Sequence, residues 1–181
     1  MPNPSDPYLT ATRQWLEKAV IGLNLCPFAK AVHLKGQIRW VVSNAENSDT
    51  LLTCIEQELQ FLAAADPAQT DTTLIVHPQV LDNFFDFNDF LARAEDSLAD
   101  FGLEGVLQIA SFHPQYQFAD AGVDDIGNCS NRSPYPTLHL LREDSISRAV
   151  AALPDAEMIY ERNIRNLKKL GRQGWLDLFK A

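Results

Sequence analysis

Short segments rich in β-branched residues alternate with amphipathic helical segments along most of this chain. The β-rich segments are residues 38–42, 72–76, 106–112 and 137–141, and apolar stripes at helical spacing over residues 51–62 and 87–101 separate the first three. Such alternation is typical of α/β proteins, in which strands joined by a helix pair in parallel through right-handed crossovers. Strands that are apolar on both faces favour a sheet covered on both sides. We therefore predict an α/β fold with a mixed four-stranded sheet and helices on both faces.

The order of elements from the first strand onward, βαβαββα, also allows a thioredoxin-like fold. Thioredoxin-like redox sites use a C-x-x-C dithiol, which this sequence lacks. Cys26 lies before the first expected strand and not after it. The thioredoxin-like order is therefore kept as the alternative.

The length of the chain, 181 residues, suits a single α/β domain that spans residues 1–181. The polar, proline-rich start makes residues 1–7 prone to disorder. A last helix is expected from about residue 156 to residue 170, with Gly171 and Gly174 ending it. Residues 155–181 are accordingly expected to form a C-terminal helical extension.

Charge and cysteine content narrow the class of protein. The formal net charge is −9 and the pI is about 4.8, and because such a surface repels phosphate backbones we expect no nucleic-acid partner. The three cysteines lack the spacing of a disulfide framework, and the N-terminus lacks the apolar core of a signal peptide. No apolar run is long enough to span a membrane. We expect a cytoplasmic protein that has no membrane partner.

A His-Pro pair follows the second expected strand, at His77, and another follows the third, at His113. Ligands of parallel sheets bind beyond the carboxyl ends of the strands, so both imidazoles are expected at one edge of the sheet. A third histidine, His139, lies inside the fourth expected strand. It is a candidate for substrate binding, and a hydrogen-bonded core histidine is the alternative.

The segment from His113 to Tyr135 is long for a connection with no expected secondary structure. Structureless connections of more than about 12–15 residues are uncommon and often form binding loops or lids. The polar and aromatic side chains of this segment include Tyr116, Asn128, Asn131, Arg132 and Tyr135. We predict that this loop and its flanking strands form the functional site; a surface loop with no role is the alternative.

Cys26 precedes a proline that can begin a helix, and a thiol near a helix N-terminus has a lowered pKa. A nucleophilic cysteine also needs a base, for which His113 is the candidate. The alternative is that Cys26 is a small buried apolar residue.

Zinc binds nitrogen and sulfur ligands, and His77, His113 and His139 are the candidates, with Cys26 or Cys129. Their spacing matches no compact zinc signature, so the fold would have to assemble such a site and no metal ligand is assigned. The sequence contains no phosphate-binding glycine loop and no nucleophile-elbow motif. Whether the protein uses a cofactor is left open.

Three blocks of sequence stand out. Asn-Leu-Cys-Pro-Phe-Ala occupies residues 24–29, Ser-Phe-His-Pro and Tyr-Gln-Phe lie within residues 111–118, and Asn-Arg-Ser-Pro-Tyr-Pro-Thr-Leu-His-Leu-Leu-Arg-Glu occupies residues 131–143. They resemble an uncharacterised bacterial family, the domain of unknown function numbered fourteen-fifteen, from about residue 12 to residue 179. The resemblance implies a small cytosolic bacterial protein that occurs as a stand-alone domain. The family carries no established activity, so the resemblance implies no catalytic residue.

These observations leave three hypotheses of function open. In the first, the protein is a small-molecule enzyme whose catalytic residues are His113, Cys26 and Tyr116. Arg132 then holds an anionic substrate group, and further substrate contacts come from Asn128, Asn131, Tyr135 and His139.

The second hypothesis is a non-catalytic binding or interaction domain, in which the apolar residues between Trp175 and Phe179 dock a partner or a second copy in a homodimer. The alternative for this tail is that it packs back on its own domain. The third is a metal-binding protein that uses His77, His113 and His139.

Overall fold

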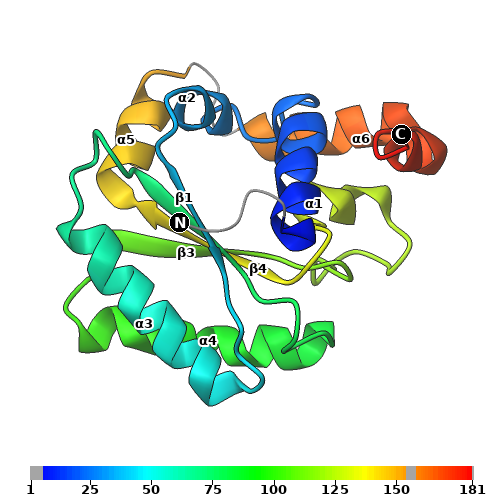
Figure 1. Ribbon diagram of the computed structural model, residues 1–181. Helices are drawn as coiled ribbons and strands as arrows, with labels where there is room; N and C mark the ends of the chain where they lie inside the picture. The colour runs from blue at the N-terminus through cyan, green and yellow to red at the C-terminus, as the bar shows by residue number, and fades with distance from the viewer. Residues whose placement is uncertain (1–5, 154–157, 181) are drawn as a thin grey trace.

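The computed structural model describes residues 6–153 and 158–180 (Figure 1). The expected disorder over residues 1–7 falls mostly outside this part of the chain, although Pro7 already begins a helix. The elements, in chain order, are α1 (Pro7–Trp15), the π-helical segment η1 (Leu16–Ile21), α2 (Ala29–Leu34), β1 (Ile38–Val42), α3 (Ser48–Ala64), β2 (Thr72–Val76), α4 (Phe84–Asp100), β3 (Leu107–Phe112), the 3₁₀ segment η2 (Ile126–Asn131), β4 (Thr137–Arg142), α5 (Glu143–Ala151) and α6 (Ile159–Asp177).

The predicted α/β fold with a mixed four-stranded sheet is confirmed. The strand order is β1-β2-β4-β3, with β1 and β2 parallel and β4 antiparallel to both of its neighbours. The direction of the fourth strand was not predictable from the sequence. Because β4 is antiparallel to β2 and β3, the sheet is mixed and not fully parallel. The helix α4 carries the chain from β2 past one strand position to β3, and β4 then returns through the long loop to fill that position.

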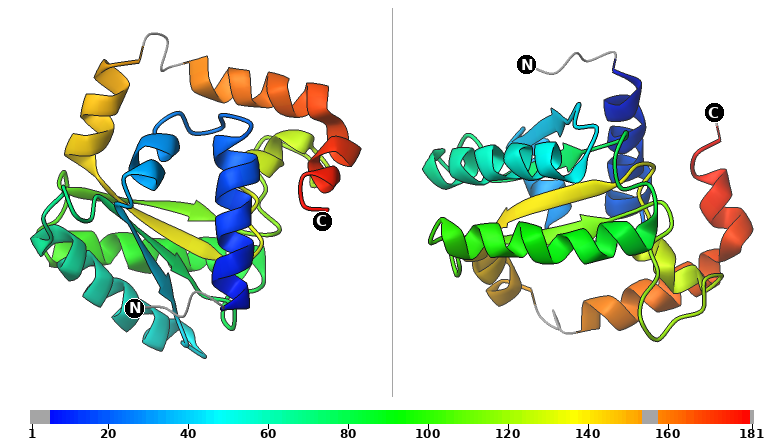
Figure 2. Two further views of the ribbon diagram at one scale, coloured as in Figure 1. Left: turned by 45° about the horizontal axis from the view of Figure 1, so that its top comes forward. Right: turned by 90° about the horizontal axis from the view of Figure 1, so that it is seen from below.

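The larger hydrophobic core lies between the sheet and the pair α3 and α4, which cover one face (Figures 1 and 2). Both helices direct their apolar stripes inward, with Ile55 and Leu59 of α3 and Phe87 of α4 fully buried. They meet Leu138 and Leu140 of β4, which are also fully buried. Burying each such side chain contributes about 1.5–3 kcal/mol, so this layer supplies much of the stability.

The opposite face of the sheet is covered by α1, η1 and α2 (Figure 2). A second cluster there consists of Trp15, Leu16, Ala19 and Val20, and Trp40 and Phe112 of the sheet pack against it. Residues 16–21 form a π-helix and do not continue α1 as a regular α-helix. A Cβ at Gly22 would lie 2.3 Å from the carbonyl oxygen of Lys18. The end of the π-helix therefore has room only for glycine at this position.

The helix ends follow local sequence. The side chains of Asp6, Asn47 and Asn83 accept hydrogen bonds from the first free N–H groups of α1, α3 and α4. Gly102, with φ of 64°, follows the end of α4 and adopts the left-handed conformation that often ends a helix. Gly171 has φ of 69° and ψ of 172° and interrupts α6, so the expected end of the last helix becomes a sharp bend within it.

Candidate functional site

His113 is fully buried at the carboxyl end of β3, and both of its ring nitrogens already have backbone partners. The amide N–H of Gln115 donates to Nδ1 over 3.0 Å, so the proton is assigned to Nε2, which lies 3.1 Å from the carbonyl oxygen of Leu81. The ring packs against Phe84 and Phe87 of α4. Burial lowers the pKa of His113, so the residue is a neutral structural group.

His77 has a parallel role at the end of β2. Its Nδ1 lies 3.1 Å from the carbonyl oxygen of Val80, and its ring stacks on Phe87 at 5.6 Å. Burial lowers the pKa of His77 to about 4. The two imidazoles lie at one sheet edge, as predicted, but both hold the turn at Val80 and Leu81, where Leu81 has a strained φ of 60°.

His139 lies on the opposite face of the sheet. It pairs in register with Leu74 and Ala110, its ring centroid is 6.3 Å from that of Phe112, and its Nε2 is 2.6 Å from Oγ1 of Thr72. The sheet therefore separates it from His77 and His113. Within residues 6–153 and 158–180 no group of three histidine, cysteine or acidic residues is placed to hold a metal ion, so the three-histidine site expected as an alternative is not formed.

Cys26 packs against the Trp15 cluster on the α1 face, whereas the ring of His113 packs against α4 on the other face. Burial raises the pKa of the Cys26 thiol, which disfavours the thiolate. The expected nucleophile–base pair is thus not formed. Tyr116 packs against Phe84 and Phe118, and burial raises the pKa of its phenol.

The polar side chains of the long loop mostly bind the loop's own backbone. The buried Asn128 accepts from the amide of Phe118 over 3.1 Å and donates to the carbonyl oxygen of Gly122 over 2.9 Å. Asn131 donates to the carbonyl oxygen of Ser111 over 3.3 Å. The ring of Tyr135 packs edge-on against Tyr8 at 4.9 Å. These side chains hold the loop in its conformation, which explains why the loop contains so many polar residues without a ligand-binding role for each.

Arg132 joins two distant parts of the same loop. Its Nε donates to the carbonyl oxygen of Tyr116 over 3.1 Å, and its Nη2 donates to that of Val123 over 2.7 Å. A guanidinium has five N–H groups, so further donors remain for another acceptor. Two cavities of similar volume lie in the described part of the chain. The one between η2 and α6 is lined by none of the expected catalytic and substrate-binding residues, and the one beside α1 is lined by Arg132 alone among them.

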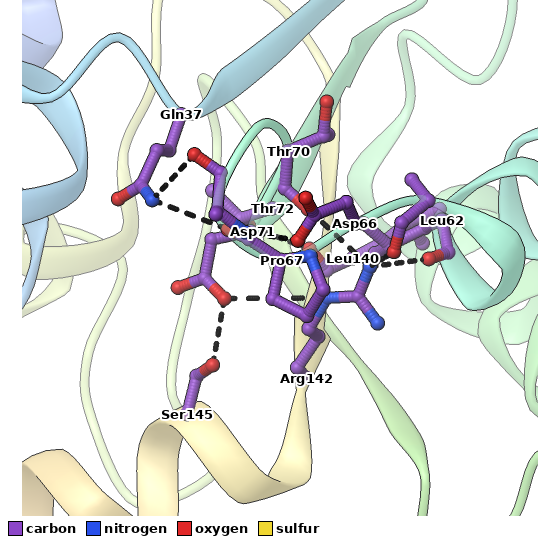
Figure 3. A network of polar contacts seen from close by, with 12 residues as sticks. Gln37, Leu62, Asp66, Pro67, Thr70, Asp71, Thr72, Leu140, Arg142 and Ser145 are labelled. Carbon is purple, nitrogen blue, oxygen red and sulfur yellow. Dashed lines mark hydrogen bonds and ion pairs between the residues drawn. The ribbon is translucent and has the colours of Figure 1, made fainter.

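Arg142, in the last of the three sequence blocks, forms a separate polar network (Figure 3). Its Nη2 lies 2.6 Å and 2.7 Å from the carbonyl oxygens of Leu62 and Ala65 at the C-terminus of α3. Nearby, Ser145 donates to Asp71 over 2.6 Å and so joins α5 to the residue before β2. This network holds the C-terminal end of α3 against β4, and Arg142 lines neither of the two cavities.

The cavity that Arg132 lines has a volume of about 440 Å³. It lies where three segments far apart in the sequence meet: α1, the loop before β4, and the C-terminal part of α6. Its wall is mostly apolar, with Trp15, Trp175 and Phe179 supplying aromatic surface. The charged side chains in the wall are Asp124, Asp125, Arg132 and Arg172.

The contributions of α1 and α6 to this cavity were not predicted. For the C-terminal aromatics, docking of a partner and packing on their own domain were the two alternatives. Trp175, Leu178 and Phe179 pack on the Trp15 cluster of the same chain, and Leu176 is 52% exposed. The signal that was available is a glycine, Gly171, followed by an apolar segment, which can indicate a helix turning back on its own domain.

Comparisons with known proteins give one match. No curated protein and no solved structure matches the chain. None of the described helices has the length and apolar character needed to cross a membrane. Residues 8–177 match the family described as "Protein of unknown function (DUF1415)". Because this match covers almost all of the sequence, the chain belongs to the DUF1415 family.

Proposed function

We propose that this protein binds a small amphipathic anion in the cavity between α1, the loop before β4 and the end of α6. The main support is Arg132, a half-buried cation in a mostly apolar wall. The described hydrogen-bond partners of Arg132 are backbone carbonyls and not a carboxylate. A volume of about 440 Å³ lies within the usual range of small-molecule sites, which is roughly 300–1,000 Å³.

None of the other wall charges is a described partner of Arg132. Asp125 accepts the amide of Gly127 over 2.7 Å and so caps η2. Asp124 lies 3.2 Å from Arg172, and both side chains are exposed, so solvent screens that pair. A partly desolvated charge is costly unless paired. An anionic ligand group would supply the counter-ion for Arg132, and the aromatic wall would cover its apolar part.

The structure favours binding over acid–base catalysis at this site. His113 and His77 face the other side of the sheet, and the raised pKa of Cys129 in the cavity wall, caused by burial, disfavours a thiolate nucleophile. We place this binding function in the cytoplasm because the three cysteines are free thiols. A homodimer is not needed to cover the C-terminal aromatics, since they pack on their own chain.

The test compares two ligands of equal chain length and opposite charge, octanoate and octylammonium. Titration followed by tryptophan fluorescence is expected to show saturable binding of octanoate and weaker binding of octylammonium. Arg132→Gln is expected to abolish most octanoate binding, with near-ultraviolet circular dichroism to show that the loop remains folded. Equal affinity for the two ligands, or no saturable binding of either, would contradict the proposal.

A matched pair of variants on α6 separates the local charge from the net charge. Arg172→Gln removes a cation from the cavity wall, and Lys168→Gln removes one from outside it. Because Arg172 is exposed, its loss is expected to weaken octanoate binding by only about 2- to 5-fold. Lys168→Gln is expected to leave the affinity unchanged, and an equal effect of both variants would show that octanoate responds only to net charge.

A further inference from the structure

Residues 172–180 follow a break in the last helix. Gly171 has φ of 69° and ψ of 172°, a combination open essentially only to glycine, and in Figure 2 the chain turns sharply after the first part of α6. The hinges of moving segments are a few positions of this kind, in loops or at the ends of elements. The bend therefore separates residues 172–180 mechanically from residues 159–170.

The first part of α6 is anchored in the body of the protein. Leu167 is fully buried in a cluster with Leu25 and Cys129. The side chain of Asn163 donates to the carbonyl oxygen of Leu25 over 2.7 Å. Moving this part of α6 would break a buried hydrogen bond and open an apolar cluster, so it is the more stable part of the helix.

Residues 172–180 lack such an anchor. In the part of the chain that the structure describes, their one side-chain hydrogen bond to another element joins Arg172 to Asp124, and both side chains are exposed, so solvent screens the pair. The last turn keeps its backbone hydrogen bonds within the segment. Regions with few buried apolar contacts open at a low cost in free energy. What holds this segment is the packing of three partly buried side chains on the Trp15 cluster: Trp175, Leu178 and Phe179.

The same segment supplies part of the cavity wall, through Arg172, Trp175, Leu176 and Phe179. We propose that residues 172–180 form a lid, which undocks from the Trp15 cluster in the free protein and is held docked by the bound ligand. This inference rests on the proposed function, because the ligand is the amphipathic anion of the same cavity. Undocking removes the aromatic wall that covers the apolar part of the ligand. The ligand therefore binds the docked form more tightly and shifts the population toward it.

Hydrogen exchange of the free full-length protein, followed residue by residue by nuclear magnetic resonance, tests the undocking. We expect the hydrogen-bonded amides of residues 174–180 to share one protection factor, lower by about tenfold or more than those of residues 163–170. Protection equal to that of the first part of α6 would overturn the lid. So would protection that declines steadily toward residue 180, since that is fraying of a helix end and not movement of a unit.

Leu178→Ala and Leu91→Ala form a matched pair of variants. Leu178 packs on the Trp15 cluster without lining the cavity, and Leu91 is also a half-buried leucine, which packs against the larger core from α4. We expect Leu178→Ala to accelerate exchange of the whole lid by about tenfold. Leu91→Ala is expected to leave lid exchange unchanged, because the lid opens without the core. Equal acceleration by both variants would show that residues 172–180 open only through global unfolding, which would overturn the inference.

Octanoate tests the coupling of the lid to the ligand. At ten times its dissociation constant, octanoate is expected to slow exchange of the lid by about tenfold, because undocking must then compete with binding. The amides of α5, which contributes no residue to the cavity wall, are the internal control and are expected to be unaffected. If octanoate saturates the protein but lid exchange does not change, the lid is wrong and the binding site stands. If octanoate does not bind saturably, the proposed function is wrong and the ligand-held lid with it, while exchange of the free protein still decides whether residues 172–180 move as a unit.

Discussion

Oγ1 of Thr72 lies 2.6 Å from Nε2 of His139 and 2.6 Å from the carbonyl oxygen of Leu140. A hydroxyl has one proton, so Thr72 donates it to the carbonyl and accepts from Nε2–H of His139. This pairing assigns the neutral Nε2–H tautomer to His139 and agrees with the pKa of about 4 that burial gives this imidazole. The hydroxyl of Thr72, at the start of β2, therefore fixes the tautomer of His139 in β4.

Thr72→Val tests this pairing. Valine has nearly the same shape but leaves the imidazole N–H and the Leu140 carbonyl without their partner, so we expect a loss of about 2 kcal/mol or more in the free energy of unfolding. Thr73→Val is the matched control, because Oγ1 of Thr73 is buried with no described partner. That variant is expected to be neutral or stabilising in urea denaturation. Equal losses in the two variants would show that the Thr72 hydroxyl has no special role.

The buried histidines predict a pH dependence of stability. Burial lowers the pKa of His77 to about 4 from its usual value of 6.5, so the unfolded chain binds the extra proton between these pH values. Stability from this group is complete above pH 6.5 and decreases as the pH falls toward 4, by roughly 3 kcal/mol. His77→Asn keeps a donor for Val80 and removes the titration. We expect a shallower decline in urea midpoint over this range, with the remainder due to His113 and His139, whose pKa values burial also lowers; an unchanged slope would contradict the assignment.

Gly171→Ala tests the bend in α6. The combination of φ 69° and ψ 172° is open essentially only to glycine, so a side chain is expected to cost about 1–3 kcal/mol or to displace residues 172–180. Displacement would expose Trp175 and Phe179, which a red shift in tryptophan emission reports. Gly122→Ala is the control, because Gly122 has ordinary φ and open space around its Cβ position. A fluorescence spectrum unchanged in both variants, with equal stability, would show that α6 tolerates the bend without glycine.

Arg142→Lys tests the network at the end of α3. Lysine keeps the charge but loses the planar guanidinium that reaches the carbonyl oxygens of Leu62 and Ala65, so we expect a loss of about 2 kcal/mol in the free energy of unfolding. Arg148→Lys, on the exposed side of α5, is the control and is expected to stay within about 0.5 kcal/mol of the parent. Hydrogen exchange of the last turn of α3 should accelerate in Arg142→Lys alone.

The sequence predicted much of the fold and little of the candidate site. All four strands were placed to within about a residue at each end, because the alternation of β-branched runs with helical stripes is a local pattern. The histidines at the ends of β2 and β3 were correctly placed at one edge of the sheet. Their use was not predictable, because an imidazole that holds a backbone carbonyl and one that binds a ligand have the same sequence signature.

The candidate cavity was only partly visible in the sequence. Arg132 was singled out through the length and polarity of its loop, whereas Trp15 and Trp175 read as ordinary core and tail residues. They line one cavity because α1 and α6 come together against the loop before β4. No spacing in the sequence encodes a contact between segments about 160 residues apart.

Periodicity of apolar residues, caps and glycines therefore determined which segments are helices and strands, since each depends on neighbours within a few residues. Tertiary structure decided the antiparallel insertion of β4, the separation of His113 from Cys26 by the sheet, and the presence of Trp15 and Arg132 in the wall of one cavity. The physical reason is that hydrogen-bond partners of a side chain are supplied by whatever the packed layers place beside it, and that placement comes from the whole chain's burial of apolar surface.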